Sequence, residues 1–188
     1  MRIDVYGFDT GAGMPLPTDY RDHPELFQAG DFPMDRQALL SALPPNAKLI
    51  LGELKTTLPP FMSGLSVHAP LGFVAVDIDY YSSAKVALNM LADPEPLKYL
   101  PLPIIYFDDV YMESQNSWCG ELLAIREFND CQAMRKIEQD RFLRTRRIFK
   151  HARWIDQIYL LHLFDHPQRQ QTAITRPTKT YIPSSRTK

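Results

Sequence analysis

Two acidic pairs carry the residues that are best suited to chemistry in this chain. Asp77 and Asp79 follow one apolar run, Asp108 and Asp109 follow another, and Asp108 lies 31 positions after Asp77. This spacing is typical of one strand–helix–strand unit, which brings both pairs to the carboxyl edge of a parallel sheet. Carboxylates that close repel, raise each other's pKa or hold a cation, and their hard oxygen atoms suit Mg²⁺, Ca²⁺ or Mn²⁺. The sequence therefore predicts a divalent-cation site; the alternative is that one pair caps a helix and the other is solvated.

A second candidate site is the segment 9–13, which reads Asp-Thr-Gly-Ala-Gly after an apolar run. Glycines at such a turn let the backbone approach a phosphate or an adenosine group. Asp9 has another use, since an acid at the end of a strand can accept hydrogen bonds from a ribose diol. Leu16 stands where the third glycine of a dinucleotide-binding loop would be, so a plain glycine turn remains an alternative.

The apolar runs of the sequence predict the strands and helices that carry these residues. Strands are expected at 3–9, 48–54, 72–79, 102–109 and 157–164. Helices are expected after Asp35 as far as Leu43, after Ser82 or Ser83 as far as Leu91, and at 118–130 and 137–150. Asp35 is expected to cap the first helix, and Ser82 or Ser83 the second. The run 72–79 is continuous, as in a strand that is buried on both faces. Because strands and helices alternate, the sequence predicts an α/β fold with a mainly parallel sheet and flanking helices.

Several short motifs in a fixed order resemble the macrocin O-methyltransferase family, whose members are class I S-adenosylmethionine-dependent and metal-dependent enzymes. The motifs span roughly residues 5–130. They are Tyr6–Thr10, Gly13–Pro15, Gly30–Phe32, Thr57–Pro59, Val76–Lys85, Tyr106–Asp109, Gly120–Leu122 and Glu127–Phe128.

The resemblance implies a Rossmann-like sheet and a set of roles for the acidic residues. It implies Mg²⁺ held by Asp77, Asp108 and Asp109, and S-adenosylmethionine bound through its ribose at Asp9 with Thr10. It also implies a small-molecule substrate, a sugar or phenol hydroxyl, that meets the metal. Asp77 or Asp79 would then lie near the proton to be removed.

The chain departs from the family pattern before Asp9, where the family's first strand and Gly-rich loop should precede. Only eight residues precede Asp9 here. We therefore expect a methyltransferase-like domain over 1–166 that is shortened at its N-terminus. A non-catalytic binding module that has lost the cofactor cradle is the alternative, and its unpaired apolar strand edge would favour self-association into a homo-oligomer.

Charge is unevenly distributed along the 188 residues. The net charge is −1, yet residues 167–188 hold five basic residues and no acidic one, which leaves a net of −6 on the remainder. We expect 167–188 to be a disordered basic tail. The segment 135–153 carries eight Lys/Arg, and the sequence favours a solvated basic helix there over nucleic-acid contact.

The remaining composition excludes several classes of protein. Two cysteines are too few for a disulfide scaffold or a four-cysteine zinc site. No segment approaches the about 18 apolar residues of a membrane helix, and the first residues lack the apolar core of a signal peptide. The sequence therefore predicts a cytoplasmic protein with no membrane partner.

Overall fold

The computed structural model describes residues 3–112 and 114–170, which contain six strands, five α-helices and five short 3₁₀ helices. The strands are β1 (Val5–Asp9), β2 (Ala47–Leu51), β3 (Leu71–Val76), β4 (Tyr99–Phe107), β5 (Arg135–Gln139) and β6 (Ile158–Leu163). The helices are α1 (Arg36–Ala42), α2 (Leu54–Gly64), α3 (Tyr81–Asn89), α4 (Gly120–Cys131) and α5 (Pro167–Gln170). In the described part of the chain, no helix is long and apolar enough to cross a bilayer.

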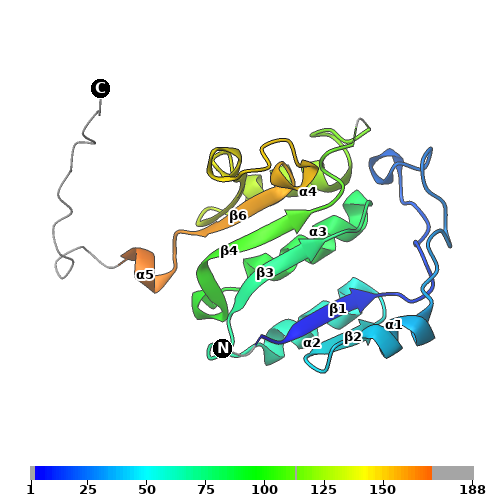
Figure 1. Cartoon of the computed structure of the whole chain (residues 1–188), viewed down its shortest axis with the longest axis horizontal. Coiled ribbons are helices and arrows are strands. Elements are labelled where there is room, and N and C mark those ends of the chain that lie inside the picture. Colours follow the sequence, from blue (N-terminus) through cyan, green and yellow to red (C-terminus); the bar gives the residue numbers. More distant parts are fainter. Residues whose placement is uncertain (1–2, 113, 171–188) are drawn as a thin grey trace.

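The strands form two sheets, one of order β1-β2 and one of order β3-β4-β6-β5. β1 runs parallel to β2 and β3 runs parallel to β4, whereas β6 is antiparallel to both of its neighbours. Figure 1 shows the arrows of β1, β3 and β4 pointing the same way, so their carboxyl ends lie on the same side of the molecule. The prediction of an α/β fold with parallel strands and flanking helices is confirmed.

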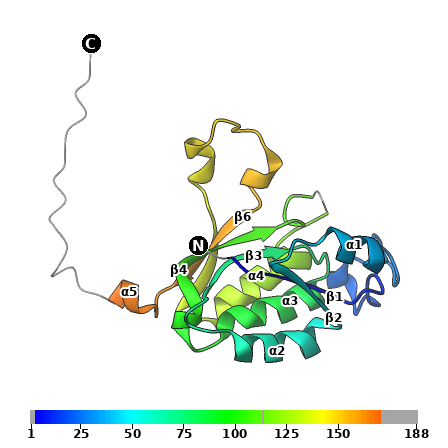
Figure 2. The same ribbon diagram turned by 60° about the horizontal axis from the view of Figure 1, so that its bottom comes forward.

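The core lies between one face of the larger sheet and the helices α2, α3 and α4, which Figure 2 shows together below the strands. In β6, Tyr159, Leu161 and Leu163 are buried and the residues between them are half-buried, which is the alternation of a strand with one packed face. Ile105 and Phe107 of β4 are completely buried on the same side. These side chains fix the register of the strands whose ends carry the acidic pairs.

The opposite face of β3 and β4 is open to solvent. Phe73 is 56% exposed and Ile104 is 42% exposed, and Leu100 and Leu102 are exposed with them. The prediction that the run 72–79 is buried on both faces is therefore wrong, because α2, α3 and α4 all pack on one side of the sheet. An apolar run shows that both faces of a strand are suited to burial, but it does not show whether other elements pack on both faces.

The edges of β1 and β3 that face each other are unpaired among the described residues. β1 bonds to β2 alone and β3 bonds to β4 alone, although β1 and β3 lie side by side in Figure 1. β1 is also mostly exposed, with Val5 47% accessible, so the expectation that 3–9 is a buried strand is wrong. Backbone N–H and C=O groups on these two edges have no ladder partner.

The expected basic helix over 137–150 is wrong. The segment begins as β5, in which Arg135 and Ile137 are buried and Lys136 is half-buried, and it continues as a loop that contains a short 3₁₀ helix, Leu143–Arg146, but no α-helix. The Asn129 side chain bonds the N–H and C=O groups of Ile137, at 2.7 and 2.8 Å, and so holds β5 against the end of α4.

The expected disordered tail is wrong for its first four residues, because Pro167–Gln170 form α5. The rest of that prediction, residues 171–188, lies outside the described residues.

Candidate functional site

Three carboxylates come together where β3 and β4 end. Asp77, Asp79 and Asp109 each offer an oxygen atom, and these atoms all lie within 4.8 Å of one another. Asp77 is exposed, Asp79 is half-buried and Asp109 is 3% exposed, so the cluster runs from solvent into the protein. Both acidic pairs that the sequence singled out thus contribute to one site.

Local backbone geometry aims Asp79 and Asp109 at each other. Asp79 has a φ of 58°, in the left-handed region that an aspartate tolerates better than most residues. Its N–H group donates to Oδ2 of Asp109 at 3.0 Å. The N–H of Asp108 donates to the carbonyl of Val76 at 3.0 Å, so the last bond of the β3–β4 ladder fixes the two loops side by side.

Glu121, in the first turn of α4, lies beneath the cluster. It is completely buried, and its Oε2 accepts the N–H of Asp109 at 3.2 Å. Its Oε1 is buried without a hydrogen-bond partner. The sequence assigned no chemistry to this residue, since a glutamate near a helix start is ordinary; only its position in one of the ordered motifs marked it.

Burial and mutual repulsion raise the pKa values of these acids. Burial, followed by the charge of Asp109, raises the pKa of Glu121 to about 9. Burial and the charge of Asp79 raise the pKa of Asp109 to about 7, and burial raises the pKa values of Asp77 and Asp79 as well. A cation among these oxygen atoms would offset the repulsion between the carboxylates.

Asp108 lies beside the three clustered carboxylates, but its hydrogen bonds are to other residues. Its carboxylate accepts from the Tyr106 hydroxyl and from Nε2 of Gln157, the latter at 3.2 Å. The same Gln157 amide donates to the Asp108 carbonyl at 2.7 Å. The bond to Asp108 raises the pKa of Tyr106 to about 12. The predicted residues Asp77 and Asp109 are thus brought together with Asp79, while Asp108 faces the base of the segment before β6.

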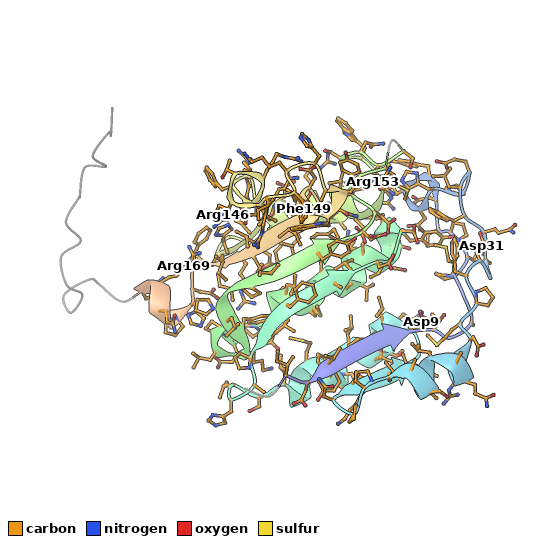
Figure 3. All side chains as sticks on the ribbon, in the orientation of Figure 1. Asp9, Asp31, Arg146, Phe149, Arg153 and Arg169 are labelled. Atoms are coloured by element: carbon orange, nitrogen blue, oxygen red, sulfur yellow. The ribbon has the colours of Figure 1, made fainter. Side chains whose placement is uncertain are left out.

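The segment 9–13 is an ordered turn at the carboxyl end of β1. Asp9 accepts the N–H of Gly11 at 2.5 Å, and the Thr10 hydroxyl donates to the carbonyl of Gly13 at 2.9 Å. Figure 3 shows Asp9 at the tip of the β1 arrow, on the same side of the molecule as the ends of β3 and β4. Asp9 is exposed, and among the described residues its other carboxylate oxygen has no hydrogen-bond partner.

Asp22 ties the long loop to the site, and the sequence did not mark it. It is completely buried; its carboxylate accepts both the N–H and the hydroxyl of Thr18, at 2.7 and 2.5 Å. Its other oxygen accepts the N–H of Ser82, in the first turn of α3, at 2.8 Å. The expected cap by Ser82 or Ser83 is therefore wrong: a residue 60 positions away caps this helix, and a partner so distant leaves no local signal.

Other members of the ordered motifs hold the scaffold rather than the acids. The Tyr81 hydroxyl and the Lys85 ammonium both donate to Oε2 of Glu127, each at 2.7 Å, which joins α3 to α4. The guanidinium of Arg21 lies over the Tyr81 ring, 4.5 Å from its centre. These contacts keep the start of α3, which follows Asp79, in place.

No protein-family model matches this chain, and no curated protein matches it. Among solved structures it is similar to CalS11, a calicheamicin methyltransferase, at 18% sequence identity and a TM-score of 0.54. That match covers 85% of this chain and 60% of the CalS11 chain, so this chain spans less than two thirds of the protein's length. An apo structure of CalS11, described as a TDP-rhamnose 3′-O-methyltransferase of calicheamicin biosynthesis, gives 18% identity and a TM-score of 0.43, over 85% of this chain and 58% of that one. The likeness is one of fold, and it does not single out the macrocin O-methyltransferase family.

Proposed function

We propose that this chain is a methyltransferase-like protein that transfers a methyl group from S-adenosylmethionine to a hydroxyl of a sugar or small metabolite, assisted by a divalent cation. The observation that carries the proposal is the cluster of Asp77, Asp79 and Asp109 at the carboxyl edge of β3 and β4. The likeness to CalS11 supports the same reaction class. Ligands of open α/β sheets bind at this edge.

The donor set fits Mg²⁺. Asp77, Asp79 and Asp109 supply carboxylate oxygens alone, with no sulfur or nitrogen donor among them. Bound there, the cation would lower the pKa of a hydroxyl group that reaches it. Asp79 or Asp77, the more exposed members, would accept the proton of the substrate hydroxyl. Asp9, with Thr10 beside it, would hold the ribose of the cofactor, so that catalysis consists largely of alignment.

Calorimetric titration tests this function. Purified protein is titrated with MgCl₂, and then with S-adenosylmethionine in the presence of Mg²⁺. We expect saturable binding of both, and weaker Mg²⁺ binding by Asp79→Asn, which keeps the size of the side chain but removes its charge. Failure of the wild type to bind either ligand would refute the enzyme function for this chain.

One observation favours a second function, a non-catalytic binding module. In the described part of the chain, no strand pairs with the edge of β1 that faces β3, or with the edge of β3 that faces β1. A strand there would bring a backbone turn to the carboxyl edge, between Asp9 and the acid cluster. Binding of Mg²⁺ without any binding of S-adenosylmethionine in the same titration would favour this module over the enzyme.

A further inference from the structure

The segment 140–157, between β5 and β6, projects from the body of the protein. Figure 2 shows it on the side of the sheet opposite to α2, α3 and α4. We call residues 140–157 the basic arm. It holds six Lys/Arg and two Asp, a net charge of +4 in a chain whose net charge is −1. Figure 3 shows Arg146, Phe149 and Arg153 on this arm, away from Asp9 and Asp31.

The base of the arm is anchored firmly. Leu143 and Ile155 are 6% and 2% exposed, so each leg of the arm has one apolar side chain that is shielded from solvent. Arg144 pairs with Asp156 at 2.5 Å, and Arg146 pairs with Asp140 at 2.7 Å. Both aspartates of the arm are thus used within it.

The apex of the arm is apolar and cationic at once. Ile148 is 92% exposed and Phe149 is 76% exposed, and Phe142, nearer the base, is 72% exposed. Arg147 and Lys150 flank the apex and have no carboxylate partner among the described residues. Exposure this high is unusual for an isoleucine and a phenylalanine that are adjacent on an anchored loop, and it marks an interaction surface.

We propose that the basic arm binds the surface of a membrane that contains anionic phospholipid. Ile148 and Phe149 would enter the boundary between headgroups and acyl chains, and Arg147 and Lys150 would meet lipid phosphates. The free cations complement such a surface in charge. A convex projection suits a flat surface, whereas single-stranded nucleic acid is held in a groove lined with stacking rings, and an isoleucine side chain has no ring to stack on a base.

This surface binding is independent of the proposed methyl transfer. The sequence predicts no membrane partner because no segment can span a bilayer, but binding at the interface needs no spanning segment. The arm also meets the candidate site at its base, where Gln157 donates to Asp108. A membrane-bound arm would therefore hold the acid cluster close to the lipid surface.

Co-sedimentation with vesicles tests the proposal. Full-length protein is mixed with vesicles of phosphatidylcholine alone, or of equal parts phosphatidylcholine and phosphatidylglycerol. We expect binding to the anionic vesicles that weakens toward about 1 M salt, where the screening length is about 3 Å. The double variant Ile148→Asp/Phe149→Asp should lower the partition coefficient about a hundredfold, and Arg147→Gln/Lys150→Gln about tenfold.

A matched control adds the same two charges elsewhere. Leu16→Asp/Leu40→Asp changes two residues that are 77% and 49% exposed, and it should bind vesicles like the wild type. Circular dichroism checks that all variants fold. The proposal would be overturned if the wild type did not bind anionic vesicles. It would also be overturned if Ile148→Asp/Phe149→Asp bound them as strongly as the wild type does. Two further outcomes would overturn the proposal. In each, vesicle binding persists in Ile148→Asp/Phe149→Asp, while this variant loses either salt-sensitive binding to a single-stranded oligonucleotide or self-association.

Discussion

At the scale of single residues, Asp108 and Asp109 are adjacent in the sequence but have different surroundings. Asp109 is buried against Asp79 and Glu121, while Asp108 accepts hydrogen bonds from Tyr106 and Gln157. Neighbouring residues at the end of a strand point to opposite sides. Of the pair Asp108-Asp109, only Asp109 therefore belongs to the cluster. Asp79 takes the place in the cluster that the family resemblance assigned to Asp108.

This difference predicts which carboxylate binds metal. Asp79→Asn should weaken Mg²⁺ binding about tenfold or more, since a carboxylate ligand is lost, as is typical of changes in a metal's ligand shell. Asp108→Asn is the matched control, and it should change the affinity much less. Isothermal calorimetry at neutral pH measures both. The reverse order of effects would favour the ligand set Asp77, Asp108 and Asp109.

Glu121 predicts how stability depends on pH. Its pKa is about 9 in the folded protein and 4.5 as its ordinary value. Between these values the folded protein keeps a proton that the unfolded chain has released. Stability from this group is therefore full below pH 4.5 and is lost as the pH rises through 9. Chemical denaturation in the absence of divalent cations should show unfolding free energy falling by on the order of 1 kcal/mol per pH unit.

The variant Glu121→Gln isolates this effect. An amide oxygen can still accept the N–H of Asp109, but the side chain carries no proton to lose. Asp109 contributes its own fall in stability up to its pKa of about 7. The variant should therefore keep only the part of the slope that Asp109 contributes below pH 7, and it should lose the slope between pH 7 and 9. A wild-type protein whose stability rises over that upper range would contradict the prediction.

At the scale of elements, the loop between β1 and α1 is ordered by backbone contacts. Met14 donates its N–H to the carbonyl of Asp31 at 2.8 Å, and Gly30 donates to the carbonyl of Met14 at 2.9 Å. These bonds join two of the ordered motifs. Gly13 has a φ of 86°, and a Cβ atom there would lie 2.5 Å from the carbonyl oxygen of Asp31.

The loop therefore predicts unequal costs for two glycine substitutions. Gly13→Ala should lower the free energy of unfolding by about 2–4 kcal/mol, because it combines a left-handed φ with a backbone clash. Gly30→Ala is the control, since Gly30 has a φ of 87° but open space around it; it should cost about 1 kcal/mol. Urea denaturation of both variants measures the difference. Equal costs would mean that the loop shifts to admit the methyl group.

At the scale of the whole molecule, the packing is one-sided. The helices α2, α3 and α4 cover one face of the larger sheet, and the other face presents Phe73 and Ile104 to solvent. The inner edges of β1 and β3 are unpaired in the described part of the chain. An open apolar face beside free strand edges promotes association between chains.

This surface predicts self-association that depends on concentration. Phe73→Lys/Ile104→Lys should shift the protein toward the monomer in light scattering coupled to size exclusion, since the charges oppose burial of the face. Leu97→Lys, at a residue that is 45% exposed in another segment, is the control and should leave the distribution unchanged. A wild-type protein that is monomeric at all concentrations tested would contradict the prediction.

The class of fold, most of its elements and the acids of the site could be predicted from the amino-acid sequence. Apolar runs place strands because burial decides them locally, and Asp35 caps α1 as expected, accepting the N–H of Ala38 at 3.0 Å. The spacing of the two acidic pairs was enough to predict that they meet, because β3 and β4 are neighbouring parallel strands. All of these signals act over a few residues or over one strand–helix–strand unit.

Several features of the protein could not be predicted, because they depend on which segments pack against each other. Contacts between distant segments decide whether Phe73 is buried and which of Asp108 and Asp109 faces Asp79. They also explain why Asp22 caps α3. The basic arm is the clearest case: its charges and rings suit a helix, but each leg of the arm is held by a buried side chain, Leu143 in one and Ile155 in the other. Burial and long-range hydrogen bonds outweigh local propensity, because each contributes more free energy than the preference of any single residue.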